Sequence, residues 1–267
     1  SGHRFRMNST GAFERVWDWP EQCRGEFDYR TLVSSFEFRA RDAFVDRSYF
    51  GLILLGTYVW SCLRDEHGNV LAPMRKFSTE MSSGLQLSTN VGRENLELDQ
   101  EAFLSSQRGV GIRWALDGDA VTARASETPF GKAVDLRVSD DDFAWDESDL
   151  LSLRGRRLGR GYQWYTPSVA GHGGSYYASA AFHTTGEVLG RRVEGFVGFD
   201  SLYGPPGEVY QTGPLFNELE LAWVTFVNLY PDGQHEFGAL CLGREHWGWA
   251  VVTDQRGERL AVSDIEA

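Results

Sequence analysis

The sequence contains few cysteines, no long hydrophobic run and fewer basic than acidic side chains. Its three cysteines, Cys23, Cys62 and Cys241, are too few and too widely spaced for a disulfide framework or a zinc site. They are expected to be small buried residues, and a reducing cytoplasm is the expected location. The longest apolar stretch, 49–60, contains two glycines and is well short of the ~18–20 residues that a membrane span needs.

The charge balance argues against two classes of partner. With 26 basic and 38 acidic side chains, the formal net charge is −12, so the chain lacks the basic surface that phosphate backbones select. We expect no nucleic acid partner, and anionic membrane surfaces are disfavoured for the same reason. Residues 1–20 are interpreted as a tag remnant that begins with Ser1-Gly-His3, followed by an N-terminal arm.

The composition favours strands. Aromatic residues make up 13% of the chain and there are 30 glycines, whereas long segments with helical periodicity are almost absent. Two hairpins are predicted from apolar runs that are separated by glycine-containing turns. They pair 52–64 with 70–77, and 111–116 with 120–125.

The C-terminal part repeats the same pattern of strand and turn. An antiparallel meander is predicted over 219–229, 235–242, 246–253 and 258–262. Strands that recur every ~8–12 residues are typical of a sandwich or barrel and not of alternating β and α units. The sequence therefore predicts an all-β protein.

A change in charge indicates where the chain divides. The acidic cluster at 139–149 is followed by the basic, glycine-rich run at 153–161. We place the boundary here, with an N-terminal domain over 21–157 and a C-terminal domain over 158–267. Residues 141–153 are predicted to form a helix, because acidic residues in its first turn and arginines in its last would suit the helix dipole. The alternative is a solvated acidic loop.

The segment Gly195-Phe-Val-Gly-Phe-Asp-Ser-Leu-Tyr-Gly204 is predicted to be a strand that leads into an acidic and aromatic loop. It resembles the lipocalin-related family of hydroxyneurosporene synthase, a carotenoid hydratase, in which such a strand ends in Asp-His-(Ser/Glu)-Trp-Gly. Asp200 and Gly204 match this pattern, Tyr203 stands where the family has tryptophan, and the histidine is absent. The resemblance implies two lipocalin-like antiparallel β-barrels or curved sheets packed together, with Asp200 facing a cavity.

Asp200 is the main candidate catalytic residue. A carboxylate among apolar and aromatic side chains is desolvated, and desolvation raises its pKa towards values that suit acid or base catalysis. Such an acid can protonate a double bond, and aromatic faces stabilise the cation that forms. Alternatively, Asp200 caps a turn by accepting hydrogen bonds from nearby backbone amides. The aromatic side chains expected to shape the substrate pocket are Trp60, Trp164, Tyr165, Tyr177, Tyr203 and Trp223.

Two glutamates form a second candidate site. Glu218 and Glu220 alternate with Leu219, Leu221 and Trp223, so both carboxylates share one face of a predicted strand. If this face lines the pocket, Glu218 is a further catalytic candidate and Glu220 a substrate-binding one. A separation of ~6.5–7 Å along a strand would also suit an inverting glycosidase. A solvated strand face produces the same alternation.

The histidines show no metal-binding pattern. None of the six has the His-x-His or His-Glu-x-x-His spacing, and no glycine-rich loop precedes a helix that could hold a phosphate group. No metal and no cofactor are expected. His183, on a predicted strand beside the Asp200 hairpin, is a catalytic candidate as the partner of a carboxylate. The alternative is an ordinary core or surface histidine.

Together these residues predict a cofactor-independent acid–base enzyme, namely a hydratase or dehydratase, an isomerase or a cyclase. Its substrate would be a small hydrophobic isoprenoid, steroid-like molecule or polyketide, because an aromatic pocket accepts such molecules. The first alternative is a lipocalin-like protein that binds the same ligand without changing it. The second is a β-sandwich enzyme that acts on carbohydrates. A homodimer is a further expectation that the sequence leaves open.

Overall fold

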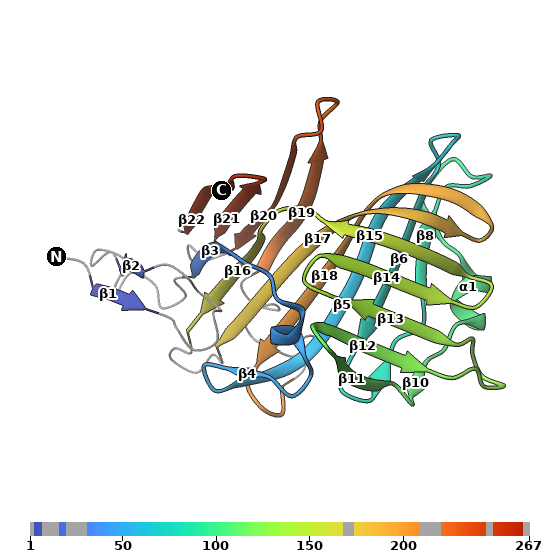
Figure 1. Cartoon of the computed structure of the whole chain (residues 1–267), viewed down its shortest axis with the longest axis horizontal. Coiled ribbons are helices and arrows are strands. Elements are labelled where there is room, and N and C mark those ends of the chain that lie inside the picture. The colour runs from blue at the N-terminus through green and yellow to red at the C-terminus, as the bar shows by residue number, and fades with distance from the viewer. Residues whose placement is uncertain are drawn as a thin grey trace.

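The computed structural model describes residues 31–167, 174–208, 220–243 and 248–263, together with the backbone of two short strands near the N-terminus. These residues confirm the predicted all-β class. A large antiparallel sheet curls into a half-barrel, and a second, smaller sheet packs beside it (Figure 1). The arrangement is consistent with lipocalin-like β-barrels.

The described strands form three sheets. The small N-terminal sheet pairs β1 (His3–Arg6) with β2 (Val16–Trp19), and the four-stranded sheet has the order β19-β20-β21-β22. Its strands are β19 (Glu220–Leu229), β20 (His235–Gly243), β21 (Trp249–Asp254) and β22 (Gly257–Ser263). The 16 strands of the large sheet are β3 (Leu32–Phe36), β4 (Ser48–Tyr49), β5 (Leu52–Asp65), β6 (Val70–Phe77), β7 (Met81–Ser82), β8 (Gln86–Thr89), β9 (Glu97–Leu98), β10 (Gly109–Val110), β11 (Arg113–Asp117), β12 (Ala120–Ala125), β13 (Val134–Val138), β14 (Asp142–Glu147), β15 (Leu151–Arg157), β16 (Gly161–Thr166), β17 (Ser175–Val188) and β18 (Arg191–Gly204).

Three long strands, β5, β18 and β17, lie next to one another in the large sheet. The first part of β17 pairs with β16, and its last part pairs with β15. The sheet therefore continues from β17 in two directions, towards β16 and β3 and towards β15 to β11. The predicted boundary after residue 157 falls between β15 and β16, two strands that share β17 as a neighbour.

The predicted hairpins and the C-terminal meander are confirmed. β5 pairs with β6, β11 pairs with β12, and β19 to β22 follow one another in antiparallel order. Helices are limited in the described residues to the 3-10 turn η2 (Ala40–Ala43) and α1 (Gln100–Ser105). The Asp99 side chain accepts a hydrogen bond from the backbone of Ala102 and caps α1.

The helix or acidic loop expected over 141–153 is wrong. This segment forms the hairpin of β14 and β15. Phe143, Trp145 and Leu153 are buried, and their neighbours Asp142 and Arg154 are exposed. This period of two is the pattern of a half-buried strand, and the burial of the alternate side chains outweighed the charge pattern that suggested a helix.

The first core lies inside the curl of the large sheet. Aliphatic side chains and phenylalanines of β5, β6, β12 to β14, β17 and β18 fill it, including Val59, Leu136 and Phe199. A charged pair, Arg75 and Glu147, is buried in this part of the molecule with no exposed side-chain surface. Arg75 Nε donates to Glu147 Oε1 over 2.6 Å, and a second guanidinium nitrogen contacts the other carboxylate oxygen.

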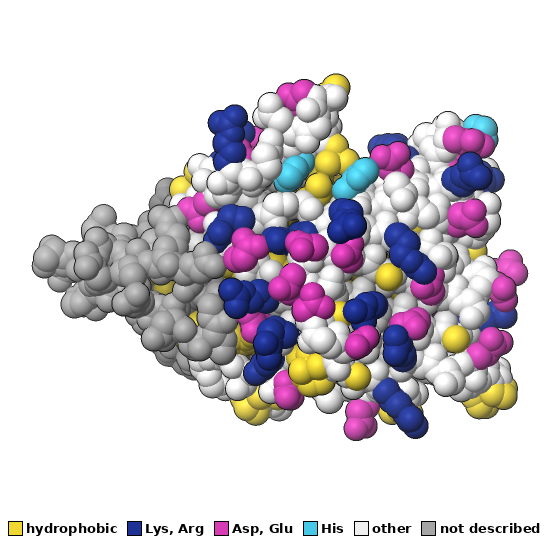
Figure 2. Space-filling model, viewed as in Figure 1, with side chains coloured by type: hydrophobic (Ala, Val, Ile, Leu, Met, Phe, Trp, Pro, Cys, Tyr) yellow, Lys and Arg dark blue, Asp and Glu magenta, His cyan; other side chains and the backbone are white. Residues whose placement is uncertain are grey.

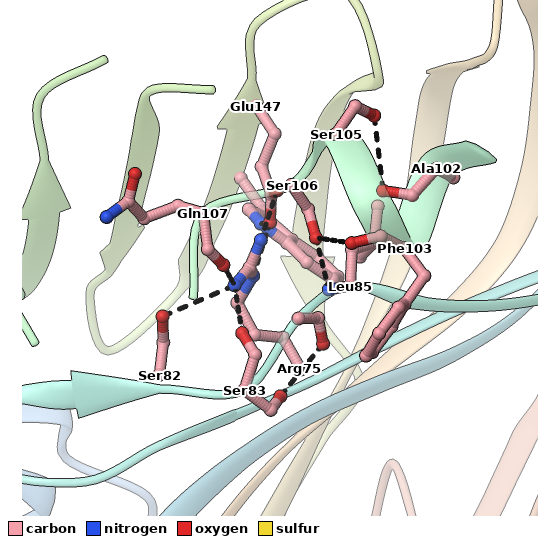
Figure 3. Close-up of polar contacts among 12 residues, drawn as sticks. Arg75, Ser82, Ser83, Leu85, Ala102, Phe103, Ser105, Ser106, Gln107 and Glu147 are labelled. Atoms are coloured by element: carbon pink, nitrogen blue, oxygen red, sulfur yellow. Dashed lines mark hydrogen bonds and ion pairs between the residues drawn. The ribbon is translucent and has the colours of Figure 1, made fainter. Parts of the chain in front are cut away.

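The other terminal nitrogen of Arg75, Nη1, also has hydrogen-bond partners. It donates to the Ser82 hydroxyl and to the carbonyl oxygens of Ser83 and Gln107, as Figure 3 shows. The pair joins β6 to β14, which lie far apart in the strand order of the large sheet. The Gln107 carbonyl adds the segment after α1 to the same network. The network therefore holds several parts of the half-barrel in one arrangement.

The second core lies between the other face of β16 to β18 and the four-stranded sheet. Its buried members are mainly aromatic and include Tyr162, Trp164, Tyr177, Phe237 and Trp249. Successive side chains of a strand point to opposite faces, so β17 and β18 supply side chains to both cores. These two strands therefore belong to both cores.

The outer face of β11 to β15 is charged. Figure 2 shows basic and acidic side chains interspersed over this part of the surface. Pairs formed across neighbouring strands include Arg124 with Asp135 and Arg154 with Asp146. This face has the character of a solvated sheet surface with mixed charges.

Candidate functional site

Asp200 lies in the C-terminal half of β18 and faces the second core. It is directly opposite Ser179 of β17 on one side and Tyr58 of β5 on the other. Only 3% of its surface is exposed. It lies inside a strand, so the alternative of a turn-capping residue is not supported, and side chains are its hydrogen-bond partners.

Three neutral donors converge on the Asp200 carboxylate. The Trp60 indole N–H and the Tyr177 hydroxyl donate to Oδ2, and the Ser179 hydroxyl donates to Oδ1. Ser179 is placed by the strand register, and Tyr177 lies two residues away on the same face of β17. The carboxylate is thus satisfied by side chains from two neighbouring strands, and none of these donors carries a positive charge.

Gly198 explains how Trp60 reaches the carboxylate. The two residues are directly opposite each other on β18 and β5. A Cβ atom at Gly198 would lie 2.2 Å from the Trp60 ring, so the indole occupies space that only glycine leaves open. Gly198 also lies two residues before Asp200, which places both on the same face of β18. The glycine in the predicted motif therefore has a packing role beside the acid.

The environment raises the pKa of Asp200 to about 6. Burial is the largest cause, because removal from water disfavours the charged form. The hydrogen bonds from Ser179, Tyr177 and Trp60 act in the opposite direction and stabilise the carboxylate. The result is an acid that both accepts and releases a proton near neutral pH.

Aromatic rings surround this acid on the side of the second core. The Trp164 and Tyr177 rings are stacked at a centroid distance of 5.7 Å, and Trp223 lies 4.8 Å from Tyr177. Burial and the charge of Asp200 both raise the pKa of the Tyr177 phenol, so this phenol remains a proton donor to the carboxylate. Of the predicted pocket residues, the structure brings Trp60, Trp164, Tyr177 and Trp223 together around Asp200 or its nearest rings.

Tyr203 and Tyr165 lie on the opposite face of the sheet from Asp200. Tyr203 packs against Tyr49 and Tyr176, with ring centroids 4.9 and 5.4 Å away, in a separate buried cluster. Tyr165 packs against the edge of that cluster. Tyr203 follows Asp200 by three residues in β18, and Tyr165 directly follows Trp164 in β16. Because successive side chains of a strand point to opposite faces, both tyrosines point away from the second core.

Glu220 lies at the start of β19, and Glu218 lies outside the described residues. The register of β19 shifts between Glu220 and Ala222, so the simple alternation of this segment is broken there. Burial raises the pKa of Glu220, and burial together with the nearby Glu220 charge raises the pKa of the Cys241 thiol. Glu220 is therefore close to a second-core residue and is not on a freely solvated face.

His183 does not contact Asp200. Its imidazole Nε2 lies 3.0 Å from Glu194 Oε1, and both side chains are substantially exposed. His183 lies four residues from Ser179 along β17, so it is beyond hydrogen-bond reach of the buried acid. The structure thus pairs it with a different carboxylate from the one of interest.

Two surface hollows are lined mainly by residues of β10 to β15 and the loops between them, away from Asp200. One has a volume of about 560 Å³ and is lined by residues that include Arg124 and Asp146. The other, of about 460 Å³, includes Arg154 and His183. Asp200 lines neither hollow.

The described ranges show neither a metal centre nor a membrane-crossing helix. Within them, no group of three or more His, Cys, Asp or Glu residues is arranged to hold a metal ion. In the same ranges no helix has the length and apolar character of a membrane-crossing segment.

Sequence analysis assigned Asp200, Trp60 and Tyr177 to one site, but it assigned no role to Ser179, Tyr58 or Gly198. One signal was available. Tyr177 and Ser179 alternate along a strand and so share a face. The pairing of Trp60 with Asp200 joins residues 140 positions apart, and no local pattern indicates it.

Comparisons with known proteins give little. No family model matches the chain, and no curated protein matches it. The search of solved structures finds the crystal structure of a "putative AttH" from Nitrosomonas europaea, with 16% identity and a TM-score of 0.39. The match covers 78% of this chain and 68% of that one. The lipocalin-like character of the fold therefore rests on the strand arrangement itself, and the resemblance to the hydroxyneurosporene synthase family stays a prediction.

Proposed function

We propose that this protein is a cofactor-independent acid–base enzyme that acts on a small hydrophobic molecule at Asp200. The observation that carries the proposal is a carboxylate that is almost fully buried, has only neutral hydrogen-bond donors and has a pKa of about 6. An acid of this kind is half protonated at about pH 6, so both its protonated and its charged form are populated close to neutral pH, which suits proton transfer. Isoprenoid, steroid-like and polyketide substrates fit an aromatic environment.

The simplest reaction that fits this site is the addition of water to a carbon–carbon double bond. Protonated Asp200 gives its proton to one carbon, and the π electrons of the double bond form the new C–H bond. Water then bonds to the positively charged carbon and returns one proton to the Asp200 carboxylate. The faces of Trp60 and Tyr177 would stabilise the cation between these steps. Dehydration is the reverse, and loss of a proton without water addition gives isomerisation.

Deuterium exchange tests this chemistry even while the product is unidentified. The protein is incubated in D₂O with an alkene panel of isoprenoid, steroid and polyketide compounds, and masses are measured. We expect incorporated deuterium or a gain of one water with wild type and at least a hundredfold lower rate with Asp200→Asn, because acid–base catalysis typically contributes 10²–10⁴-fold. Asp46→Asn, at an exposed aspartate, is the matched control.

A second candidate function is ligand binding without turnover. It is favoured by the three hydrogen bonds that already satisfy Asp200, since a structural carboxylate has such partners. Calorimetric titration with the same compounds separates the two. If Asp200→Asn retains affinity and wild type shows no exchange with any alkene, the protein is a carrier and the enzyme proposal is wrong. Sugar affinity that depends on Glu220 would instead support a carbohydrate enzyme.

A further inference from the structure

Lys76 lies in the same cross-strand row as the proposed acid. It is directly opposite Tyr58 on β5, and Tyr58 is directly opposite Asp200 on β18. Directly opposed residues of neighbouring strands point to the same face of a sheet. Lys76 and Asp200 are therefore on one face, two strand spacings or about 10 Å apart.

The Lys76 ammonium group lies over the Tyr58 ring and has no acidic partner among the described residues. Its Nζ lies 5.3 Å from the centre of the Tyr58 ring, within the range of a cation–π contact. The side chain is half-buried, and this burial lowers the pKa of the amine. No ion pair of the described part of the chain includes Lys76, although acidic residues outnumber basic ones.

The chain has only two lysines, and the contrast between them is informative. Lys132 is 2.8 Å from Asp149 and also lies near Glu127, so its charge is balanced by carboxylates. Lys76 is partly withdrawn from water and contacts a ring instead. A half-buried cation without a counter-ion is a binding point for an anion, because a charge-assisted hydrogen bond would compensate its lost hydration.

Gly56 makes room for the lysine side chain. A Cβ atom at Gly56 would lie 2.7 Å from Lys76 Cε, closer than carbon atoms approach without moving. Gly56 lies two residues before Tyr58, on the same face of β5. The lysine stem therefore lies beside a position of β5 that has no side chain, on the sheet face that also carries Asp200.

We propose that Lys76 binds the anionic head group, a carboxylate or a phosphate, of an otherwise apolar substrate. This inference rests on the proposed function and narrows its substrate class to amphipathic anions. The apolar body would lie over Tyr58 and Trp60, which are both half-buried, and would place its reacting carbon near Asp200. The bound head group would fix the position of the apolar part of the substrate relative to Asp200 and so hold the reacting carbon near the acid.

Calorimetry with three probes tests the head group: a long-chain fatty acid, an isoprenoid monophosphate and the matching isoprenoid alcohol. We expect wild type to bind at least one anion tenfold or more tightly than the alcohol, the effect of one charge-assisted hydrogen bond. The two anionic probes show whether a carboxylate or a phosphate is preferred. Equal affinity for all three probes would overturn the inference.

Three variants assign the effect to this site. Lys76→Met should abolish the preference for the anion and leave alcohol binding unchanged, whereas Lys132→Met should change neither. Gly56→Ala keeps every charge but displaces the lysine stem, and it should weaken anion binding only. An unchanged preference in Lys76→Met would contradict the inference even if the Gly56 variant fails to fold.

The result is separable from that of the proposed function. Loss of turnover in Asp200→Asn together with normal anion binding in Lys76→Met would refute the lysine site alone. Anion binding that depends on Lys76 without any turnover by wild type would refute the enzyme alone and define a carrier of amphipathic anions.

Discussion

A buried carboxylate that contacts a tryptophan lies beside each of the two cores, and the two carboxylates differ in their other hydrogen-bond donors. Beside the first core, Glu147 receives two bonds from the Arg75 guanidinium and a third, of 2.9 Å, from the Trp145 indole. Beside the second, Asp200 also receives an indole N–H, from Trp60, but its other donors are hydroxyl groups. Each acid therefore accepts a hydrogen bond from a tryptophan of its own, but only Glu147 is also paired with a positively charged side chain.

This difference determines what each acid can do. A buried carboxylate that is paired with a bidentate arginine joins the strands that carry the two side chains. For a buried carboxylate with neutral partners, such as Asp200, desolvation raises the pKa and the hydrogen bonds only partly offset this rise. Such an acid exchanges its proton near neutral pH. The Arg75 network therefore joins strands, whereas the Asp200 site is the one for which we propose a chemical role.

The largest expected effect comes from breaking the ion pair. Glu147→Gln leaves the Arg75 charge buried without compensation, and we expect it to lower the free energy of unfolding by about 3–5 kcal/mol. Urea denaturation at pH 7 measures this. Glu127→Gln, at an exposed glutamate 3.9 Å from Lys132, should change stability by less than about 1 kcal/mol. Equal effects of the two variants would show that the Arg75–Glu147 pair does not stabilise the fold more than an exposed pair does.

The next effect is the contribution of Asp200 to the pH dependence of stability. Its folded-state pKa of about 6 is above its ordinary value of 3.8, so the folded state favours the protonated form. The resulting stabilisation is complete below pH 3.8 and is lost as the pH rises through 6, by on the order of 3 kcal/mol. Asp200→Asn does not titrate there.

The measurement is the difference in unfolding free energy between wild type and Asp200→Asn from pH 4 to pH 7. Wild type should lose stability relative to the variant over this interval. A constant difference would mean that the pKa of Asp200 is the same in the folded and unfolded chains.

A smaller effect is expected where Trp60 passes over glycine. Gly198→Ala places a methyl group into the Trp60 ring and should cost about 1–3 kcal/mol of stability by overpacking. It should also raise the pKa of Asp200, because the displaced indole no longer donates to the carboxylate. In a Trp60→Ala background the same substitution should cost less, and a double-mutant cycle in urea measures that coupling. Strict additivity would show that the contact is unimportant.

The smallest effect is expected on the charged outer face. Arg124 and Asp135 are 3.0 Å apart, but both side chains are about half exposed. Asp135→Asn should therefore change the free energy of unfolding by less than about 1 kcal/mol, and added salt should reduce even that. Denaturation at low and high salt checks this. A loss comparable to that of Glu147→Gln would show that exposure does not separate the two kinds of pair.

Local patterns predicted the fold well where turns and alternation agree. The hairpin of β5 and β6 and the meander of β19 to β22 follow directly from apolar runs between glycine turns. The same alternation places Arg75 on the buried face of β6 with Leu71 and Phe77, and it places Glu147 on that of β14 with Trp145. Two opposite charges at buried positions are a signal that sequence analysis could have used to predict the ion pair.

Other features depend on contacts that no single segment contains. The burial of Asp200 was predictable from its apolar neighbours, but its partner Trp60 comes from a strand 140 residues earlier. The placement of Glu220 depends on a register shift in β19, which follows from pairing with β20. The 141–153 segment shows the reverse error, since a charge pattern was given more weight than the alternation of Phe143 and Trp145.

The 14-residue strands β17 and β18 border both cores and limit how this chain can change its length. Deleting one residue near the middle of β18 would exchange its two faces over the rest of the strand, because side chains alternate with a period of two. Phe199 would turn towards the aromatic side and Asp200 towards the aliphatic side. Insertions and deletions that preserve the fold must therefore occur in the loops, whereas β17 and β18 must keep a fixed number of residues.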